Sequence, residues 1–221
     1  GILSGTGVGL GNGLIVTKWN ITPFIVTLGM SYMVRGFVLI LANGVTIIDL
    51  PKMFLQLGQG KVIGIQYPII ITIAIVIVGD ILLRKSSFFR QNYYIGGNEK
   101  AAAMTGIKVM KIKMFNYALV GSLAAFAGVL TAARLGSASV NIGQGLELQV
   151  ITACVIGGAS LNGGEGSVLG AFLGTLLMAT LLNSLNLLGV DVYWQNVFSG
   201  AILIGAVILD VVMKTKRESV V

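Results

Sequence analysis

Ile95-Gly-Gly-Asn-Glu-Lys-Ala-Ala-Ala-Met-Thr-Gly-Ile107 stands between two apolar segments that are long enough to cross a bilayer. Asn98 is a favourable N-cap residue, Glu99 suits the positive end of a helix, and Gly106 suits a left-handed helix end. Residues 99–105 are rich in strong helix formers, chiefly alanine. The stretch therefore predicts a short helix outside the bilayer. Because so short a helix is marginal on its own, it also predicts a partner against which the helix docks.

The composition excludes a soluble globular domain. Of the 221 residues, 55% are hydrophobic and 10% are charged, whereas soluble chains carry about 25% charged residues. The chain has no histidine and one cysteine, Cys154. It therefore cannot form an internal disulfide, and it lacks the commonest general base and metal ligand. We expect no catalytic residue, no metal site and no cofactor bound by this chain.

The apolar segments predict an all-α, polytopic membrane protein with about six to seven membrane segments, most of them near the ~20 residues of a span. Segment 147–160 is too short to cross unaided. We expect it to be a re-entrant element or half-helix that is buried in protein or lines a cavity. The segments lie at residues 1–16, 23–42, 68–83, 114–134, 147–160, 166–188 and 194–213.

The positions of the cations predict how the chain is oriented, because Lys and Arg are enriched in cytoplasmic loops. Eleven of the 15 cations would share one side of the membrane. We therefore expect the loop 84–113 and the C-terminus to be cytoplasmic, and the net charge of +7 to reflect topology rather than nucleic-acid binding. The eleven are Lys18, Arg84, Lys85, Arg90, Lys100, Lys108, Lys111, Lys113, Lys214, Lys216 and Arg217.

The connection 43–67 would then lie outside the cytoplasm. Pro51 suits the first turn of a helix and Gly58 its end, so residues 51–57 are predicted to form a short surface helix. Its apolar side chains either pack on the membrane interface and neighbouring spans, or form an outer gate or a docking surface for a binding protein.

Two glycine stripes predict close helix packing, because small residues at four-residue spacing let membrane helices approach closely. The sequence has no Gly-x-x-x-x-Gly-Lys-Ser/Thr motif, so the chain cannot supply a P-loop for ATP. Any ATP and Mg²⁺ would bind to another polypeptide. The stripes are Gly1, Gly5, Gly9 and Gly13, and Gly166, Gly170 and Gly174.

Polar groups within the apolar segments mark candidate parts of a path or gate. Arg35 lies near the middle of a span, where it is either a structural ion pair or carbonyl clamp, or a pore-lining group. Glu147 suits the N-terminus of the short helix that follows it. Residues 162–166 break the chain, either as unwound backbone that lines a path or as a tight turn, with Glu165 in the first turn of the next helix. The candidate path residues are Arg35, Asn162, Gly163 and Gly164.

Three groups of residues, in order along nearly the whole chain, make this sequence resemble the permease subunits of ABC importers, in the ribose and simple-sugar branch of the branched-chain amino acid and ribose permease family. Members of this family are longer at the N-terminus, so the resemblance implies that the first spans are missing here. The residues that carry it are Pro23-Phe-Ile-Val-Thr-Leu-Gly29 with Arg35-Gly36, Gly96-Gly-Asn-Glu-Lys-Ala-Ala with Gly106-Ile107, and Glu147 with Gly157-Gly-Ala-Ser-Leu-Asn-Gly-Gly-Glu-Gly166, Gly170 and Gly174.

The resemblance implies that residues 1–221 form one transmembrane permease domain, in the bacterial cytoplasmic membrane, that performs no covalent chemistry. It implies that residues 98–107 form the coupling helix, which fits into a cleft of a separate ATPase subunit. The implied partners are two cytoplasmic ATPase subunits, a second permease copy or homologue, an extracytoplasmic substrate-binding protein and membrane lipid. The implied coupling residues are Gly97, Asn98, Glu99, Ala101, Ala102, Thr105, Gly106 and Ile107.

Other functions stay open as alternatives. Branched-chain amino acid and nucleoside permeases belong to neighbouring branches, although the Gly96-Gly-Asn98 form of the loop favours a sugar such as a pentose or hexose. An ion-coupled transporter or channel requires acids deep within the spans, whereas the acids here lie near span ends. An intramembrane enzyme requires a nucleophile with a partner base, for which the sequence offers no histidine.

Overall fold

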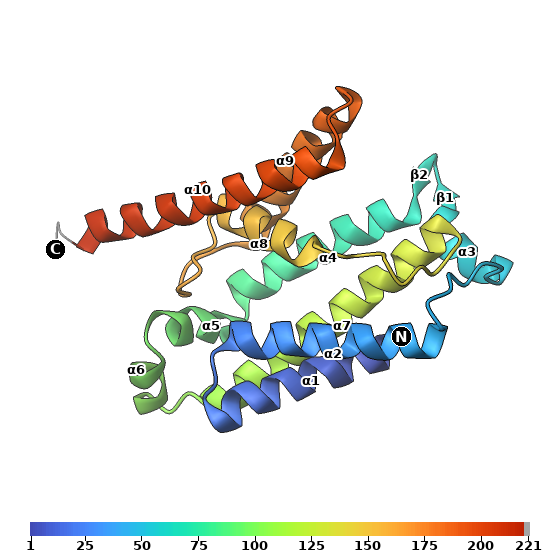
Figure 1. The fold of residues 1–221 in the computed structure, drawn as a ribbon. Helices are drawn as coiled ribbons and strands as arrows, with labels where there is room; N and C mark the ends of the chain where they lie inside the picture. The colour runs from blue at the N-terminus through green and yellow to red at the C-terminus, as the bar shows by residue number, and fades with distance from the viewer. Residues whose placement is uncertain (219–221) are drawn as a thin grey trace. The chain divides into compact units, whose positions relative to one another are not determined.

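The computed structural model describes residues 1–218 of the chain (Figure 1). Within them the fold is almost entirely helical, with one two-stranded antiparallel hairpin, so the prediction of an all-α protein is confirmed. The elements are α1 Ile2–Trp19, α2 Pro23–Ala42, α3 Lys52–Gln59, β1 Lys61–Val62, β2 Ile65–Gln66, α4 Tyr67–Lys85, α5 Ser87–Gly97, α6 Glu99–Met104, α7 Val109–Leu135, α8 Leu146–Ile156, α9 Val168–Leu187 and α10 Val192–Glu218.

Five of the described helices, α2, α4, α7, α9 and α10, are long and apolar enough to cross a membrane. In the most apolar stretch of each of these helices, at most 11% of the residues are buried within the protein itself. Apolar surface on this scale is stable only against lipid or other protein, so the chain is a multi-pass membrane protein, as predicted. α1, whose residues 1–16 were expected to be an apolar membrane segment, is not among the five, because its glycines, Asn12 and Lys18 lower its hydropathy.

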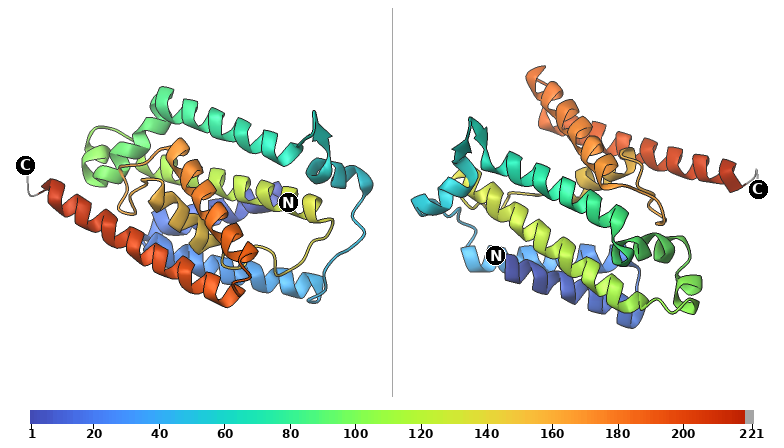
Figure 2. Two further views of the ribbon diagram at one scale, coloured as in Figure 1. Left: turned by 90° about the horizontal axis from the view of Figure 1, so that it is seen from above. Right: turned by 180° about the vertical axis from the view of Figure 1, so that it is seen from behind.

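The chain forms two compact units, of which the first comprises Gly1–Ile73 and Lys108–Ile142. At its centre α1 packs along α7 (Figure 2). The contact is made by the predicted glycine stripe: a Cβ added to Gly5 would overlap with Gly121, and one added to Gly9 would overlap with the Tyr117 carbonyl. Gly9 and Gly13 are buried in this contact. Glycine is needed here because the two backbones touch.

The predicted surface helix is present as α3, with Pro51 at its N-cap and α7 as its packing partner. The prediction that Gly58 ends this helix is wrong. Gly58 lies within α3 and is buried, because its missing side chain lets the helix approach the backbone of Ala133 and Arg134. The helix ends one residue before Gly60. The exposed Met53, at 84% accessibility, agrees with a helix at a surface or interface.

The second unit comprises Ala74–Ile107 and Gly143–Val221. The short apolar segment forms the half-length helix α8, with Glu147 in its first turn as predicted. α8 packs on both α9 and α10. Added Cβ atoms at Gly170 and Gly174 of α9 would overlap with the carbonyl groups of Gly157 and Ala153 respectively. These two glycines let α8 and α9 pack backbone to backbone.

Gly166 does not share this role. The Ser167 side chain accepts a hydrogen bond from the Gly170 N–H at 3.0 Å and so caps α9, which begins at Val168. Gly166 therefore precedes the helix, with a φ of 144° that L residues rarely adopt. The expectation that Glu165 is a first-turn acid of this helix is wrong for the same reason, because the first turn contains no acid.

Candidate functional site

The helix predicted from residues 98–107 is present as α6, and its ends have the expected chemistry. The Asn98 Oδ1 accepts a hydrogen bond from the Ala101 N–H at 3.0 Å. Glu99 lies in the first turn, where a carboxylate complements the helix dipole. Gly106 follows the helix with a φ of +86°, in the left-handed region that glycine enters without strain. The local part of the prediction is therefore confirmed.

A second helix, α5, precedes α6 and was not predicted. α5 runs from Ser87 to Gly97 and meets α6 at Asn98, which ends one helix and caps the other. Ile95 is buried in this unit and Ala102 of α6 is buried as well. The residues before Asn98 therefore form a second rigid element beside the short helix, rather than an irregular loop. We call the two helices together, residues 87–107, the α5–α6 elbow.

The elbow lines an open pocket of about 490 Å³. Every residue of the predicted coupling set except Glu99 and Gly106 contributes to its wall. The sequence reasoning missed two aromatic residues of α5, Tyr93 and Tyr94, because it assigned no helix to this segment. The pocket is lined by Tyr93, Tyr94, Gly97, Asn98, Ala101, Ala102, Thr105 and Ile107.

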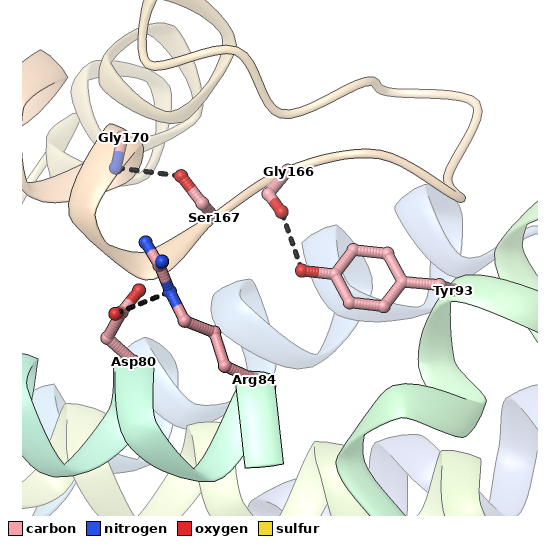
Figure 3. Close-up of polar contacts among 6 residues, drawn as sticks. All are labelled: Asp80, Arg84, Tyr93, Gly166, Ser167 and Gly170. Atoms are coloured by element: carbon pink, nitrogen blue, oxygen red, sulfur yellow. Dashed lines mark hydrogen bonds and ion pairs between the residues drawn. The ribbon is translucent and has the colours of Figure 1, made fainter. Parts of the chain in front are cut away.

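The elbow is fastened to the segment that connects α8 with α9. We call this segment, residues 157–167, the α8–α9 linker. The Tyr93 hydroxyl donates a hydrogen bond to the Gly166 carbonyl oxygen at 2.7 Å (Figure 3). Gly96 lies directly against Gly163 and Gly164, so closely that a Cβ at Gly96 would overlap with the linker backbone. The structure thus brings together the predicted coupling residues and two of the predicted path residues.

The linker is an ordered turn. The Ser160 N–H donates to the Glu165 carbonyl at 3.2 Å, and this bond closes the turn that contains residues 161–164. The Ser160 hydroxyl also lies 3.3 Å from the Asp210 carboxylate of α10. The linker therefore contacts α5 on one side and α10 on the other. The bonds show a turn between α8 and α9, and its place beside a path stays a prediction.

Arg35, the charged path candidate, and the ion pair of Asp80 with Arg84 belong neither to the elbow nor to the linker. Arg35 is half-buried in α2 of the first unit, and it keeps both of its alternative roles. Asp80, near the cytoplasmic end predicted for α4, pairs with Arg84 one turn later at 2.7 Å (Figure 3). The cations Lys214, Lys216 and Arg217, on which the predicted position of the tail depends, have side chains outside those that the structure describes. Among the described residues, no three His, Cys, Asp or Glu side chains gather into a metal-binding group.

Comparisons with known proteins find one family and several relatives that are similar to this chain. Residues 1–207 match the family described as branched-chain amino acid transport system / permease component. The chain is 39% identical over 219 residues to the L-arabinose ABC transporter permease protein AraH of Azospirillum brasilense, covering 99% of this chain and 65% of the relative. No solved structure shows a significant match.

Two ribose permeases are similar as well. The ribose import permease protein RbsC of Bacillus subtilis is 42% identical over 201 residues, which cover 90% of this chain and 62% of the relative. The protein of the same name in Escherichia coli K12 is 37% identical over 210 residues, which cover 93% and 65%. The chain thus spans just under two thirds of the length of these relatives.

Proposed function

The chain belongs to the family of branched-chain amino acid transport system permease components, and from this we propose that it is the membrane-spanning subunit of an ATP-driven sugar importer. The observation that carries the proposal is the α5–α6 elbow: a capped short helix and a pocket, on a chain whose other helices are mostly apolar spans. The subunit forms the path for the sugar and performs no covalent chemistry.

The substrate that we propose is a pentose or a closely related sugar. The relatives are named for L-arabinose and ribose, which are both five-carbon sugars. The family description names branched-chain amino acids, so these form the second candidate. Uptake of ribose, L-arabinose and leucine by cells that carry only this importer distinguishes the two.

The energy for transport would come from partner subunits. Because the sequence lacks a P-loop motif, ATP and Mg²⁺ bind to cytoplasmic ATPase subunits rather than to this chain. We propose that residues 84–113 and the C-terminus face the cytoplasm of a bacterial inner membrane. A second permease completes the path, and an extracytoplasmic binding protein delivers the sugar.

The elbow gives the ATPase a point of attachment. α6 is too short to be stable alone, but the Asn98 cap and the packing of Ala102 hold it in place. In this proposal, the ATPase contacts α6 and the pocket beside it. When the ATPase subunits close on ATP, they displace the elbow, and the spans tilt between outward and inward access.

Purification of the full-length protein in mild detergent tests the proposal first. We expect an ATPase with a P-loop to copurify in stoichiometric amount. A stable protein that brings no nucleotide-binding partner in several mild detergents would contradict the importer and favour a secondary transporter or channel.

Two variants test the elbow in the reconstituted complex. Glu99→Arg places a cation at the positive helix end, and Gly106→Val forces a β-branched residue into a φ of +86°. Both are expected to insert normally yet abolish sugar-stimulated ATP hydrolysis. Asp191→Arg, which reverses an exposed acid just before α10, is the control and is expected to keep it. Full stimulation in both elbow variants would remove α6 from the mechanism.

A further inference from the structure

The α8–α9 linker contacts the elbow, and it also contacts or continues into α8, α9 and α10. On the elbow side it accepts the Tyr93 hydrogen bond and lies against Gly96. On the other side its Ser160 binds Asp210 of α10, and its last residue, Ser167, caps α9. It is continuous with α8 at Gly157. One short segment therefore connects the elbow to three helices of the second unit.

These contacts are stiff. A glycine-to-glycine approach leaves no flexible side chain between the two backbones, so Gly96 cannot move toward the linker without moving Gly163 and Gly164. The Tyr93 ring has only two side-chain torsions, and its hydroxyl lies within 2.7 Å of the Gly166 carbonyl. The hydrogen bond of this ring therefore keeps Gly166 from moving away from α5. Together they let α5 both push and pull the linker.

We propose that the α8–α9 linker transmits movement of the elbow to α8, α9 and α10, with Tyr93 as the positioning residue that fastens the two together. This inference rests on the proposed function, because it concerns how ATP-driven displacement of α6 reaches the spans. It adds to that function a defined route: from α6 through α5 to Tyr93 and Gly96, then through the linker to the cap of α9 and to Asp210 of α10.

The test removes only the hydroxyl. Tyr93→Phe in the full-length permease, reconstituted with its ATPase and binding protein, is expected to lower the sugar transported per ATP hydrolysed by roughly twofold to tenfold, the range for loss of one hydrogen bond. Ribose and L-arabinose are the probes. The yield of folded, membrane-inserted permease is expected to equal that of the wild type, whereas a variant that merely destabilised the fold would lower this yield. Tyr32→Phe, at a tyrosine that is 75% exposed on α2, is the matched control.

A second pair of variants tests the glycine contact without the hydroxyl. Gly96→Ala places a methyl group against Gly163 and Gly164, whereas Gly128→Ala on α7 meets nothing within 4 Å. Both glycines lie within helices, where alanine is the better helix former. We expect Gly96→Ala to lower the coupling ratio and to speed amide hydrogen exchange in residues 159–166, and Gly128→Ala to do neither.

The outcomes separate the two proposals. If the wild-type complex shows no sugar-stimulated hydrolysis, the proposed function fails. If the wild type is coupled, but Tyr93→Phe and Gly96→Ala keep the same coupling ratio as their controls, the linker route is wrong and the importer stands. Hydrogen exchange of the wild-type complex gives an independent reading: a non-hydrolysable ATP analogue is expected to change exchange in residues 99–107 and 159–166 together. A change confined to 99–107 would overturn the route.

Discussion

Gly5 of α1 and Gly121 of α7 pack backbone against backbone, so that a Cβ on either residue would overlap with the carbonyl oxygen of the other. In a membrane, where the hydrophobic effect does not drive helices together, this close approach supplies the packing that holds the two helices side by side. The finding explains why a helix of modest hydropathy, α1, is held along α7.

Because the α1–α7 contact has no room for a side chain, a larger residue there should destabilise the protein. Gly121→Leu is expected to lower the free energy of unfolding by about 2–3 kcal/mol, because overpacking forces the two helices apart. Gly128→Leu, on the same helix but facing open space, is the control and should cost little. Melting temperatures of the purified protein in one detergent check this. Equal losses in the two variants would show that the contact is not a source of stability.

The pair of Asp80 and Arg84 predicts a measurable coupling between them. The Asp80 side chain is 13% exposed and the Arg84 side chain 64%, so removing the arginine leaves a mostly buried carboxylate unpaired. A cycle of Asp80→Asn, Arg84→Ala and the double variant should give a coupling free energy of about 1 kcal/mol, the upper end of the range for exposed ion pairs, because Asp80 is mostly buried. Strict additivity of the two single changes would contradict the pairing.

The Asn98 cap predicts a local effect on α6. Asn98→Ala removes the acceptor of the Ala101 N–H and should destabilise the helix by about 1 kcal/mol. Hydrogen exchange of residues 99–104 is expected to speed up about fivefold as a result. Asn98→Asp keeps an acceptor and should exchange as the wild type does. Similar exchange in all three proteins would mean that tertiary packing alone holds α6.

The Ser167 cap predicts a similar cost at the start of α9. Ser167→Ala removes the acceptor of the Gly170 N–H and is expected to lower the free energy of unfolding by about 1 kcal/mol. Ser184→Ala is the control on the same helix, since that hydroxyl only donates back to the Thr180 carbonyl, which already has a helical partner. A thermal denaturation series compares the two. A larger loss for Ser184→Ala would contradict the role of the cap.

The sequence predicts those elements whose signals are local. The cap, the alanines and the terminal glycine of α6 lie within ten residues of one another, and each acts on its own neighbours. The length of an apolar run likewise depends only on the run itself, which is why the short helix α8 and most of the spans were predictable.

The candidate site was only partly predictable, because its contacts join residues far apart in the chain. Tyr93 and Gly166 are 73 positions apart, and nothing near either residue marks the other. Glycines are ambiguous as well. Gly58 lies where the sequence predicts a helix end, but it lets α3 approach the backbone of α7 closely. Gly166 continues the four-residue spacing of Gly170 and Gly174, but it lies before α9 begins. α5 was missed because its aromatic, polar sequence gives no clear apolar period.

The backbone of the α8–α9 linker limits how it can vary in evolution. Four of its glycines have φ values between +82° and +144°, where other residues are strained. These positions admit little besides glycine, and a related protein can change the linker only at the residues between them, such as Leu161, Asn162 and Glu165. Under the proposed function, adaptation to a different ATPase or sugar would therefore alter the side chains of this turn while its backbone path stays the same.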